Sequence, residues 1–107
     1  MMKIGIVVST EEPETCWNAF RFANFSVKQG DEVKVFLIGR GVEYEKTSTT
    51  KFDTAAQARD LLRAGGKILA CGTCIKSREQ AESDICPIST MKDLYDIVKE
   101  SDKVLTF

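Results

Sequence analysis

The sequence predicts an α/β fold in which helices cover both faces of a mainly parallel β-sheet. Short apolar segments alternate with longer segments of helical periodicity along the 107 residues. The connections between these segments are short, which suits right-handed crossovers between parallel strands. The first apolar segment, residues 3–9, is a nearly continuous Ile/Val run, as expected for a strand that is buried on both faces.

The first helix is predicted over residues 13–28. Pro13 stands in its first turn, where a missing N–H costs nothing, and Gly30 follows its end. Its apolar side chains cover more than one stripe, because Phe22 and Phe25 add to the inner face. We interpret this apolar surface as packed against the sheet. The alternative is that a partner subunit covers the apolar side chains that extend beyond one stripe.

Residues 33–38 predict the second strand, and Gly39-Arg40-Gly41 after it is a lone GxG pattern that we interpret as a turn. Residues 42–51 are mostly polar, so we expect an exposed loop that is mobile or lies over a site. Thr54 and Gln57 have the spacing of a capping box, which predicts the start of the second helix.

The last part of the chain repeats the alternation of strand and helix. Thr90 and Asp93 form a capping-box pattern, and apolar residues then recur at helical spacing. The elements expected here are an end of the second helix at Gly65-Gly66, a strand over 67–71, a short helix over 74–80, an extended segment at Ile88, a helix carrying Met91, Leu94, Tyr95 and Val98, and a strand over 103–107.

Length and charge limit the classes of function. A chain of this length suits one domain over residues 1–107. Its 15 basic and 16 acidic residues nearly balance, so nucleic acid and anionic membranes are unfavourable partners. No apolar run approaches the roughly 20 residues of a membrane span. The N-terminal segment lacks the features of a signal peptide, so we expect a cytoplasmic protein.

Function is expected at the carboxyl ends of the strands, where sites gather in parallel sheets. The first such loop, residues 9–15, has three carboxylates and no glycine, so it would repel a flavin phosphate. A phosphorelay receiver needs an aspartate after the third strand, and this chain has Cys71 there. The chain contains no histidine, which excludes Cys-His and Ser-His-Asp catalysis.

The third strand ends in the pattern Cys71-Gly-Thr-Cys74, which leaves four interpretations open. The first is persulfide or thiol-exchange chemistry, since the predicted helix start and Arg78, four residues after Cys74, favour a thiolate. The second is a structural role, and the third is a thioredoxin-type redox motif. The fourth is a zinc site that also uses Cys16 and Cys86, although the spacing of a strong Cys₄ motif is absent. Cys16 on its own is interpreted as structural.

The segment from Ile68 to Arg78, with its two cysteines, resembles the cysteine segment of the DsrE/DsrF-like (TusD-related) sulfur-relay family. Other segments resemble the same family in order and length across nearly the whole chain. These are Lys3–Ser9, Trp17–Phe20, Val33–Gly39, Met91–Leu94 and Asp102–Phe107.

The resemblance implies a flavodoxin-like three-layer fold in a homo- or hetero-oligomer such as a trimer or hexamer, and we expect a homo-oligomer. It also implies a sulfur carrier or sulfurtransferase in which Cys71 accepts sulfane sulfur as a persulfide. Cys74 would resolve the persulfide or assist, and Arg78 matches the family's arginine, whereas Glu79 replaces a glycine that often follows. The implied partners are sulfur-donor and sulfur-acceptor proteins, with no cofactor or metal. The alternative is a non-catalytic binding module, or a thiol redox protein, with structural cysteines.

Overall fold

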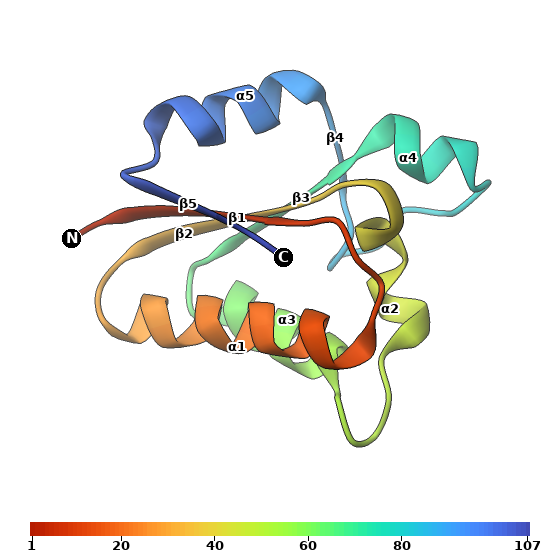
Figure 1. The fold of residues 1–107 in the computed structure, drawn as a ribbon, viewed down its shortest axis with the longest axis horizontal. Coiled ribbons are helices and arrows are strands. Elements are labelled where there is room, and N and C mark those ends of the chain that lie inside the picture. The colour runs from red at the N-terminus through yellow and green to blue at the C-terminus, as the bar shows by residue number, and fades with distance from the viewer.

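The computed structural model describes residues 1–107 and contains a five-stranded sheet with the strand order β4-β3-β2-β1-β5 (Figure 1). All neighbouring strands are parallel. The strands are β1 (Lys3–Val8), β2 (Glu32–Leu37), β3 (Lys67–Cys71), β4 (Ile88–Ser89) and β5 (Lys103–Thr106). The helices are α1 (Pro13–Lys28), α2 (Tyr44–Thr47), α3 (Thr54–Arg63), α4 (Gly72–Ser77) and α5 (Met91–Glu100), with a 3₁₀ helix η1 (Gly39–Glu43) after β2.

The elements form three layers. Helices α1 and α3 lie on one face of the sheet, and α5 lies on the other (Figure 1). The sequence prediction of an α/β sandwich with a parallel sheet is therefore confirmed. Helix α1 has the predicted bounds, and Gly30 after it has the positive φ of +91° that glycine adopts readily. The predicted capping box of Thr90 and Asp93 is also present at the start of α5.

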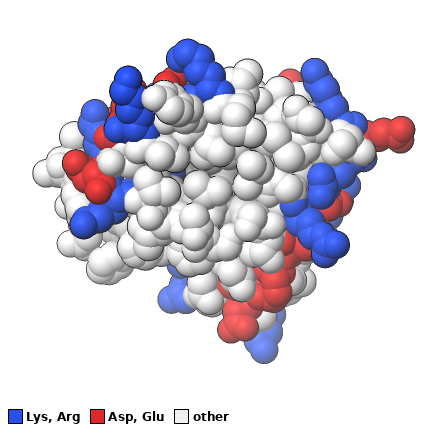
Figure 2. All heavy atoms as spheres, turned by 45° about the horizontal axis from the view of Figure 1, so that its top comes forward, with Lys and Arg blue, Asp and Glu red and all other residues white.

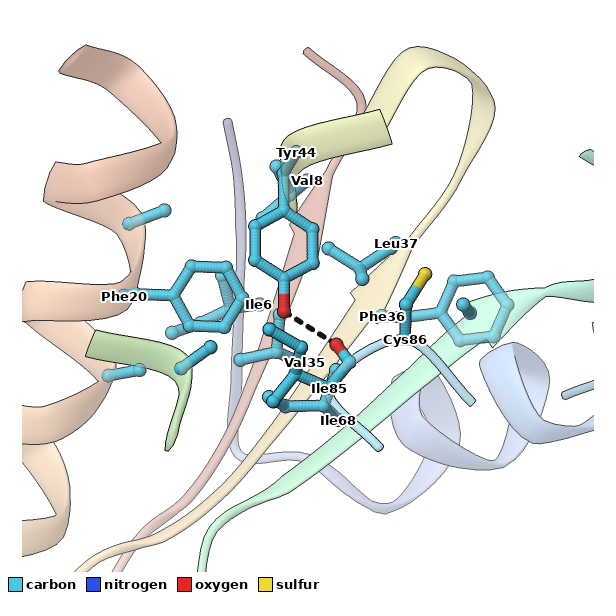
Figure 3. Close-up of a cluster of buried hydrophobic side chains, with 14 of the residues drawn as sticks. Ile6, Val8, Phe20, Val35, Phe36, Leu37, Tyr44, Ile68, Ile85 and Cys86 are labelled. Atoms are coloured by element: carbon cyan, nitrogen blue, oxygen red, sulfur yellow. Dashed lines mark hydrogen bonds between the residues drawn. The ribbon is translucent and has the colours of Figure 1, made fainter. Parts of the chain in front are cut away.

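The hydrophobic core between the sheet and helix α1 includes Tyr44, which belongs to α2 and not to a strand. Phe20 of α1 stacks on the ring of Tyr44, with 5.0 Å between their centroids (Figure 3). The Tyr44 hydroxyl donates a hydrogen bond of 2.5 Å to the carbonyl oxygen of Ile85. Both Tyr44 and Ile85 are completely buried, so two segments far apart in the sequence meet inside the core.

The prediction of an exposed loop over residues 42–51 is wrong for residues 42–47, whereas residues 49–51 are exposed and lie outside the helices and strands. This segment contains the end of η1 and all of α2, and the side chains of Val42 and Tyr44 are completely buried. Its polar composition reflects the side chains that point outward, whereas two apolar side chains hold the segment against the core. The thiol of Cys86 also donates to the Val42 carbonyl at 3.5 Å.

Two predicted helix starts are corrected as well. The N-cap of α3 is Asp53, whose carboxylate accepts the N–H of Ala56 at 3.1 Å. Gln57 instead bonds Asn24 of α1, so the predicted capping box of Thr54 and Gln57 does not form. Helix α4 begins at Gly72 rather than near position 74, because the side chain of the last strand residue caps it.

Helix α5 buries little of its apolar surface in this chain. Ile97 packs on the sheet, whereas Met91, Tyr95 and Val98 are 60%, 62% and 51% exposed. Figure 2, turned so that the α5 side comes forward, shows uncharged side chains in the middle of this face and charged ones at its border. No helix combines the length and the apolar composition that crossing a bilayer requires.

Candidate functional site

The carboxyl ends of β2, β3 and β4 lie side by side, because the register pairs Leu37 with Ala70 and Cys71 with Ser89. A cavity of about 480 Å³ opens at this edge of the sheet. Its lining combines two thiols, several apolar side chains, three hydroxyl groups and one lysine: Ile38, Cys71, Gly72, Thr73, Cys74, Lys76, Ile88, Ser89, Thr90 and Met91. The structure therefore brings both cysteines of the CxxC pattern to one cavity.

Cys71 is both the last residue of β3 and the N-cap of α4. Its sulfur accepts the backbone N–H of Cys74 at 3.4 Å, which satisfies one of the free donors of the first helical turn. Gly72 follows in a tight position, since a Cβ there would lie 3.0 Å from both Ile88 Cγ2 and the Ser89 oxygen. The turn is therefore packed closely against β4, and this packing positions the Cys71 sulfur.

Cys74 is partly exposed, and its sulfur accepts the backbone N–H of Gly39 at 3.3 Å. Burial raises the pKa of the Cys74 thiol, and hydrogen bonding to Cys71 raises it further. The Gly39 N–H and the Arg78 charge lower this pKa, but their effects are smaller. The sequence-based expectation that the helix start and Arg78 favour a Cys74 thiolate is not met, because desolvation outweighs the favourable groups.

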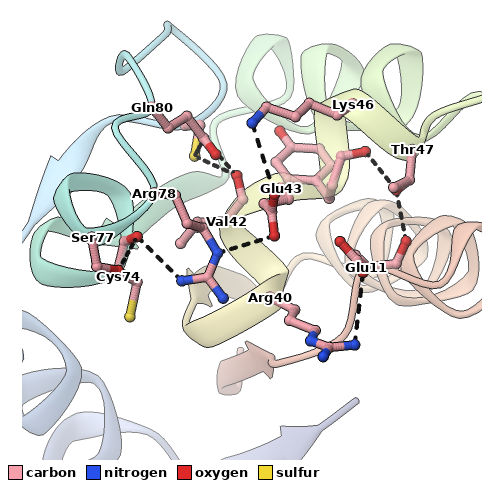
Figure 4. Close-up of polar contacts among 12 residues, drawn as sticks. Glu11, Arg40, Val42, Glu43, Lys46, Thr47, Cys74, Ser77, Arg78 and Gln80 are labelled. Carbon is pink, nitrogen blue, oxygen red and sulfur yellow. Dashed lines mark hydrogen bonds and ion pairs between the residues drawn. The ribbon is translucent and has the colours of Figure 1, made fainter.

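Arg78 does not point at a sulfur atom. Its Nε donates to the Glu43 carboxylate at 3.0 Å, and its Nη1 donates to the Cys74 carbonyl at 3.3 Å (Figure 4). Hydrogen bonding from Arg78 holds the pKa of the Glu43 carboxyl below its usual range. The arginine thus connects α4 to η1, and these bonds hold the CxxC turn in place.

The other two cysteines lie in the core, away from the cavity. The Cys16 thiol donates to the Thr10 carbonyl at 3.1 Å, and both Cys16 and Cys86 are completely buried. Desolvation by burial raises the pKa of each thiol to about 11. No three His, Cys, Asp or Glu side chains come close enough together to hold a metal ion, so the structure does not assemble the four-cysteine zinc site.

These environments predict selective alkylation. In the native protein at pH 8, Cys16 and Cys86 should resist iodoacetamide, because both are buried and remain protonated well below their raised pKa. Alkylation should instead be confined to Cys71 and Cys74, as measured by peptide mass mapping after short labelling times.

Unfolding provides the control for this experiment. In guanidinium chloride all four cysteines should react at similar rates, because burial is then lost. Fast labelling of Cys16 or Cys86 in the native protein would contradict the buried positions described above.

Sequence reasoning misses two residues that contact the candidate site residues. The sequence indicates a turn at Gly39 and an exposed loop at Glu43. In the structure the Gly39 N–H donates to the Cys74 sulfur, and the Glu43 carboxylate accepts a hydrogen bond from Arg78. The predicted strand order is the signal from which these two contacts could have been inferred. In a parallel sheet, residues that follow one strand lie beside those that follow its neighbour, so the segment after β2 must lie next to the CxxC turn.

Comparisons with known proteins find a family and relatives that are similar to this chain in sequence. The model of the family described as "DsrE/DsrF-like family" matches residues 2–107. An uncharacterized protein of Methanocaldococcus jannaschii is 33% identical over 115 residues, covering 99% of this chain and 100% of that protein. An uncharacterized protein of Methanopyrus kandleri is 38% identical over 111 residues, covering 94% of this chain and 91% of that protein.

A solved structure has the same fold. It is that of a conserved protein of unknown function from Bacteroides thetaiotaomicron, with a TM-score of 0.78 and 21% identity. The match covers 98% of this chain and 94% of that one. At this level of identity the likeness concerns the arrangement of the elements, and it supports the three-layer sandwich.

Proposed function

The chain belongs to the DsrE/DsrF-like family, and we propose that it is a sulfur carrier in which Cys71 holds a sulfane sulfur as a persulfide. The observation that carries this proposal is the position of Cys71. Its sulfur lies at the carboxyl end of β3, in the wall of a cavity of about 480 Å³ that also contains the Cys74 thiol.

Loading is a simple thiol exchange. The Cys71 thiolate attacks the outer sulfur of a persulfide donor R–S–SH, a bond forms between the two sulfurs, and R–S⁻ leaves. Cys71 then carries –S–SH, and attack by the thiolate of an acceptor on the outer sulfur reverses the process. Cys74, whose raised pKa keeps its proton in place at neutral pH, can return a proton to the leaving thiolate.

The surroundings of Cys71 suit a reactive persulfide. The residue is only 6% exposed, and Ile38, Ile88 and Met91 make part of the cavity wall apolar. Such a wall restricts access of water and of stray thiols to a bound sulfur. The cavity nevertheless stays open on the surface side, where Ile88 and Met91 are 43% and 60% exposed.

The donor and acceptor in this proposal are proteins. The exposed side chains of α5 form an apolar stripe that begins at the cavity with Met91 and continues along the helix through Tyr95 and Val98. A protein that packs on this stripe would place a reactive cysteine of its own next to the cavity. An apolar contact face of this kind is more typical of a protein partner than of a small anion.

The proposal predicts a sulfur adduct that depends on Cys71. After incubation with a low-molecular-weight persulfide and removal of the excess, intact mass should show a gain of one sulfur atom. Cys71→Ser should lose this adduct while it keeps its fold, because serine is a favourable N-cap for α4. Cys16→Ala is the matched control, since its thiol lies in the core, and it should load as the wild type does. An adduct of equal size on Cys71→Ser, or no adduct on either the wild type or Cys74→Ser, would refute the proposal.

A further inference from the structure

Two thiols occupy one turn beside one cavity, although a sulfur carrier needs only one. We propose that the chain has a further activity, persulfide reduction: Cys74 attacks the persulfide held on Cys71, hydrogen sulfide is released, and a Cys71–Cys74 disulfide remains. This inference rests on the proposed loading of Cys71, and it assigns the fate of that sulfur when no acceptor is bound.

The geometry places the attacking residue next to the loaded one. The hydrogen bond from the Cys74 N–H to the Cys71 sulfur fixes the two residues in a single turn. Cys71 is the N-cap of α4, Cys74 lies in the first turn of that helix, and the two thiols are close enough for hydrogen bonding between them to raise the pKa of Cys74. A disulfide needs its Cβ atoms about 3.5–4.5 Å apart, so closing the bond requires rotation of the Cys74 side chain and tightening of this one turn.

One backbone group assists the attack by Cys74, although burial raises the pKa of its thiol. The Gly39 N–H, whose nitrogen is 3.3 Å from this sulfur, stabilises the thiolate as the proton leaves and so offsets part of the effect of burial. Arg78 holds the Cys74 carbonyl and is itself held by Glu43, so the start of α4 is tied to η1. No other cysteine competes for the persulfide, because Cys16 and Cys86 are buried in the core and do not line the cavity.

The step balances without any further reactant. Cys71–S–SH and Cys74–SH give Cys71–S–S–Cys74 and H₂S. The Cys74 sulfur bonds to the inner sulfur on Cys71, the bond between the inner and outer sulfurs breaks, and the outer sulfur leaves as HS⁻ and takes the Cys74 proton. The sulfane sulfur is reduced to sulfide, and the two thiols are oxidised to a disulfide.

A second turnover needs a reductant of the thiol class. Two molecules of a low-molecular-weight thiol, or one dithiol, exchange with the disulfide, restore both cysteines and leave as a disulfide. The chain would then convert persulfides to sulfide at the expense of thiols. Carrier and reductase activities would compete for the same loaded Cys71, and a bound acceptor would favour transfer.

The test follows the loaded protein without reductant and without oxygen. The full chain is loaded with a low-molecular-weight persulfide and freed of the excess, and intact mass and trapped sulfide are then measured over time. In the wild type the adduct should decay as sulfide appears, leaving a chain lighter than the reduced protein by two hydrogens, with residues 71 and 74 linked in the peptide map. In Cys74→Ser the adduct should persist at least about tenfold longer, because the intramolecular nucleophile is missing.

Two variants keep the result interpretable. Serine at position 74 can still accept the Gly39 N–H, so the turn should be retained, and Cys16→Ala should decay as the wild type does. Equal persistence of the adduct in the wild type and in Cys74→Ser, or sulfide release without a 71–74 disulfide, would overturn the inference and leave the carrier proposal intact. Failure of the wild type and Cys74→Ser to take up sulfur at all would overturn the carrier proposal, and the inference with it.

Discussion

Replacement of Tyr44 with alanine is expected to lower the free energy of unfolding by about 3–5 kcal/mol. The ring of Tyr44 is completely buried and stacks on Phe20, so its removal leaves a large cavity in the core. The substitution also leaves the buried Ile85 carbonyl without its hydrogen-bond donor. The total stability of a small domain is about 5–15 kcal/mol, so this loss is large. Unfolding in urea, followed by circular dichroism, measures it.

Two further variants separate the sources of this effect. Tyr44→Phe keeps the ring and removes only the hydroxyl, so it should cost about 1–3 kcal/mol. Tyr95→Ala is the matched control, because Tyr95 is 62% exposed on α5, and its loss should change stability by less than about 0.5 kcal/mol. A Tyr44→Ala protein as stable as Tyr95→Ala would mean that residues 42–51 are the exposed loop that their composition suggests.

Replacement of Gly41 with alanine should cost about 3 kcal/mol or more. A Cβ at this position would lie 2.0 Å from the Val8 carbonyl oxygen and 2.8 Å from its carbon. Both are backbone atoms at the end of β1, so no side-chain rotation can relieve the clash. The substitution must displace η1, which follows β2 and carries the Glu43 partner of Arg78.

Gly39→Ala provides the comparison two residues earlier in the same helix. Gly39 has a φ of +57°, and a Cβ added there would meet no atom within 4 Å beyond its own chain neighbours. Its cost is therefore that of a left-handed backbone alone, about 1–2 kcal/mol. Chemical denaturation of both variants should rank Gly41→Ala as clearly the less stable. The reverse order would contradict the close approach of η1 to β1.

Most strands and helices could be predicted because their signals are local. The apolar run of β1, the proline and glycine around α1, and the capping box of α5 each lie within a few residues of the element that they specify. The start of α4 could not be placed correctly because its N-cap is Cys71, and cysteine is not among the residues favoured as caps.

The remaining features depend on contacts between distant segments. The two thiols could be predicted as a pair from their spacing alone. The partners of Cys74 and Arg78 could not, because Gly39 and Glu43 each lie 35 positions away from the residue they bond. Burial of Tyr44 likewise depends on Phe20 and Ile85, and nothing in residues 42–51 alone indicates it.

The Cys71 sulfur is at once the cap of α4 and the atom that would be loaded. In the loaded state this atom is bonded to a second sulfur, which changes its strength as an acceptor for the Cys74 N–H. If Cys71 carries sulfur as proposed, occupancy of the site would be coupled to the local stability of the first turn of α4. By thermodynamic linkage, a partner that distinguishes an ordered turn from a loosened one would bind the loaded and empty chains with different affinities. A change in one hydrogen bond would then be enough for a partner to distinguish the loaded chain from the empty one, without any movement of the sheet.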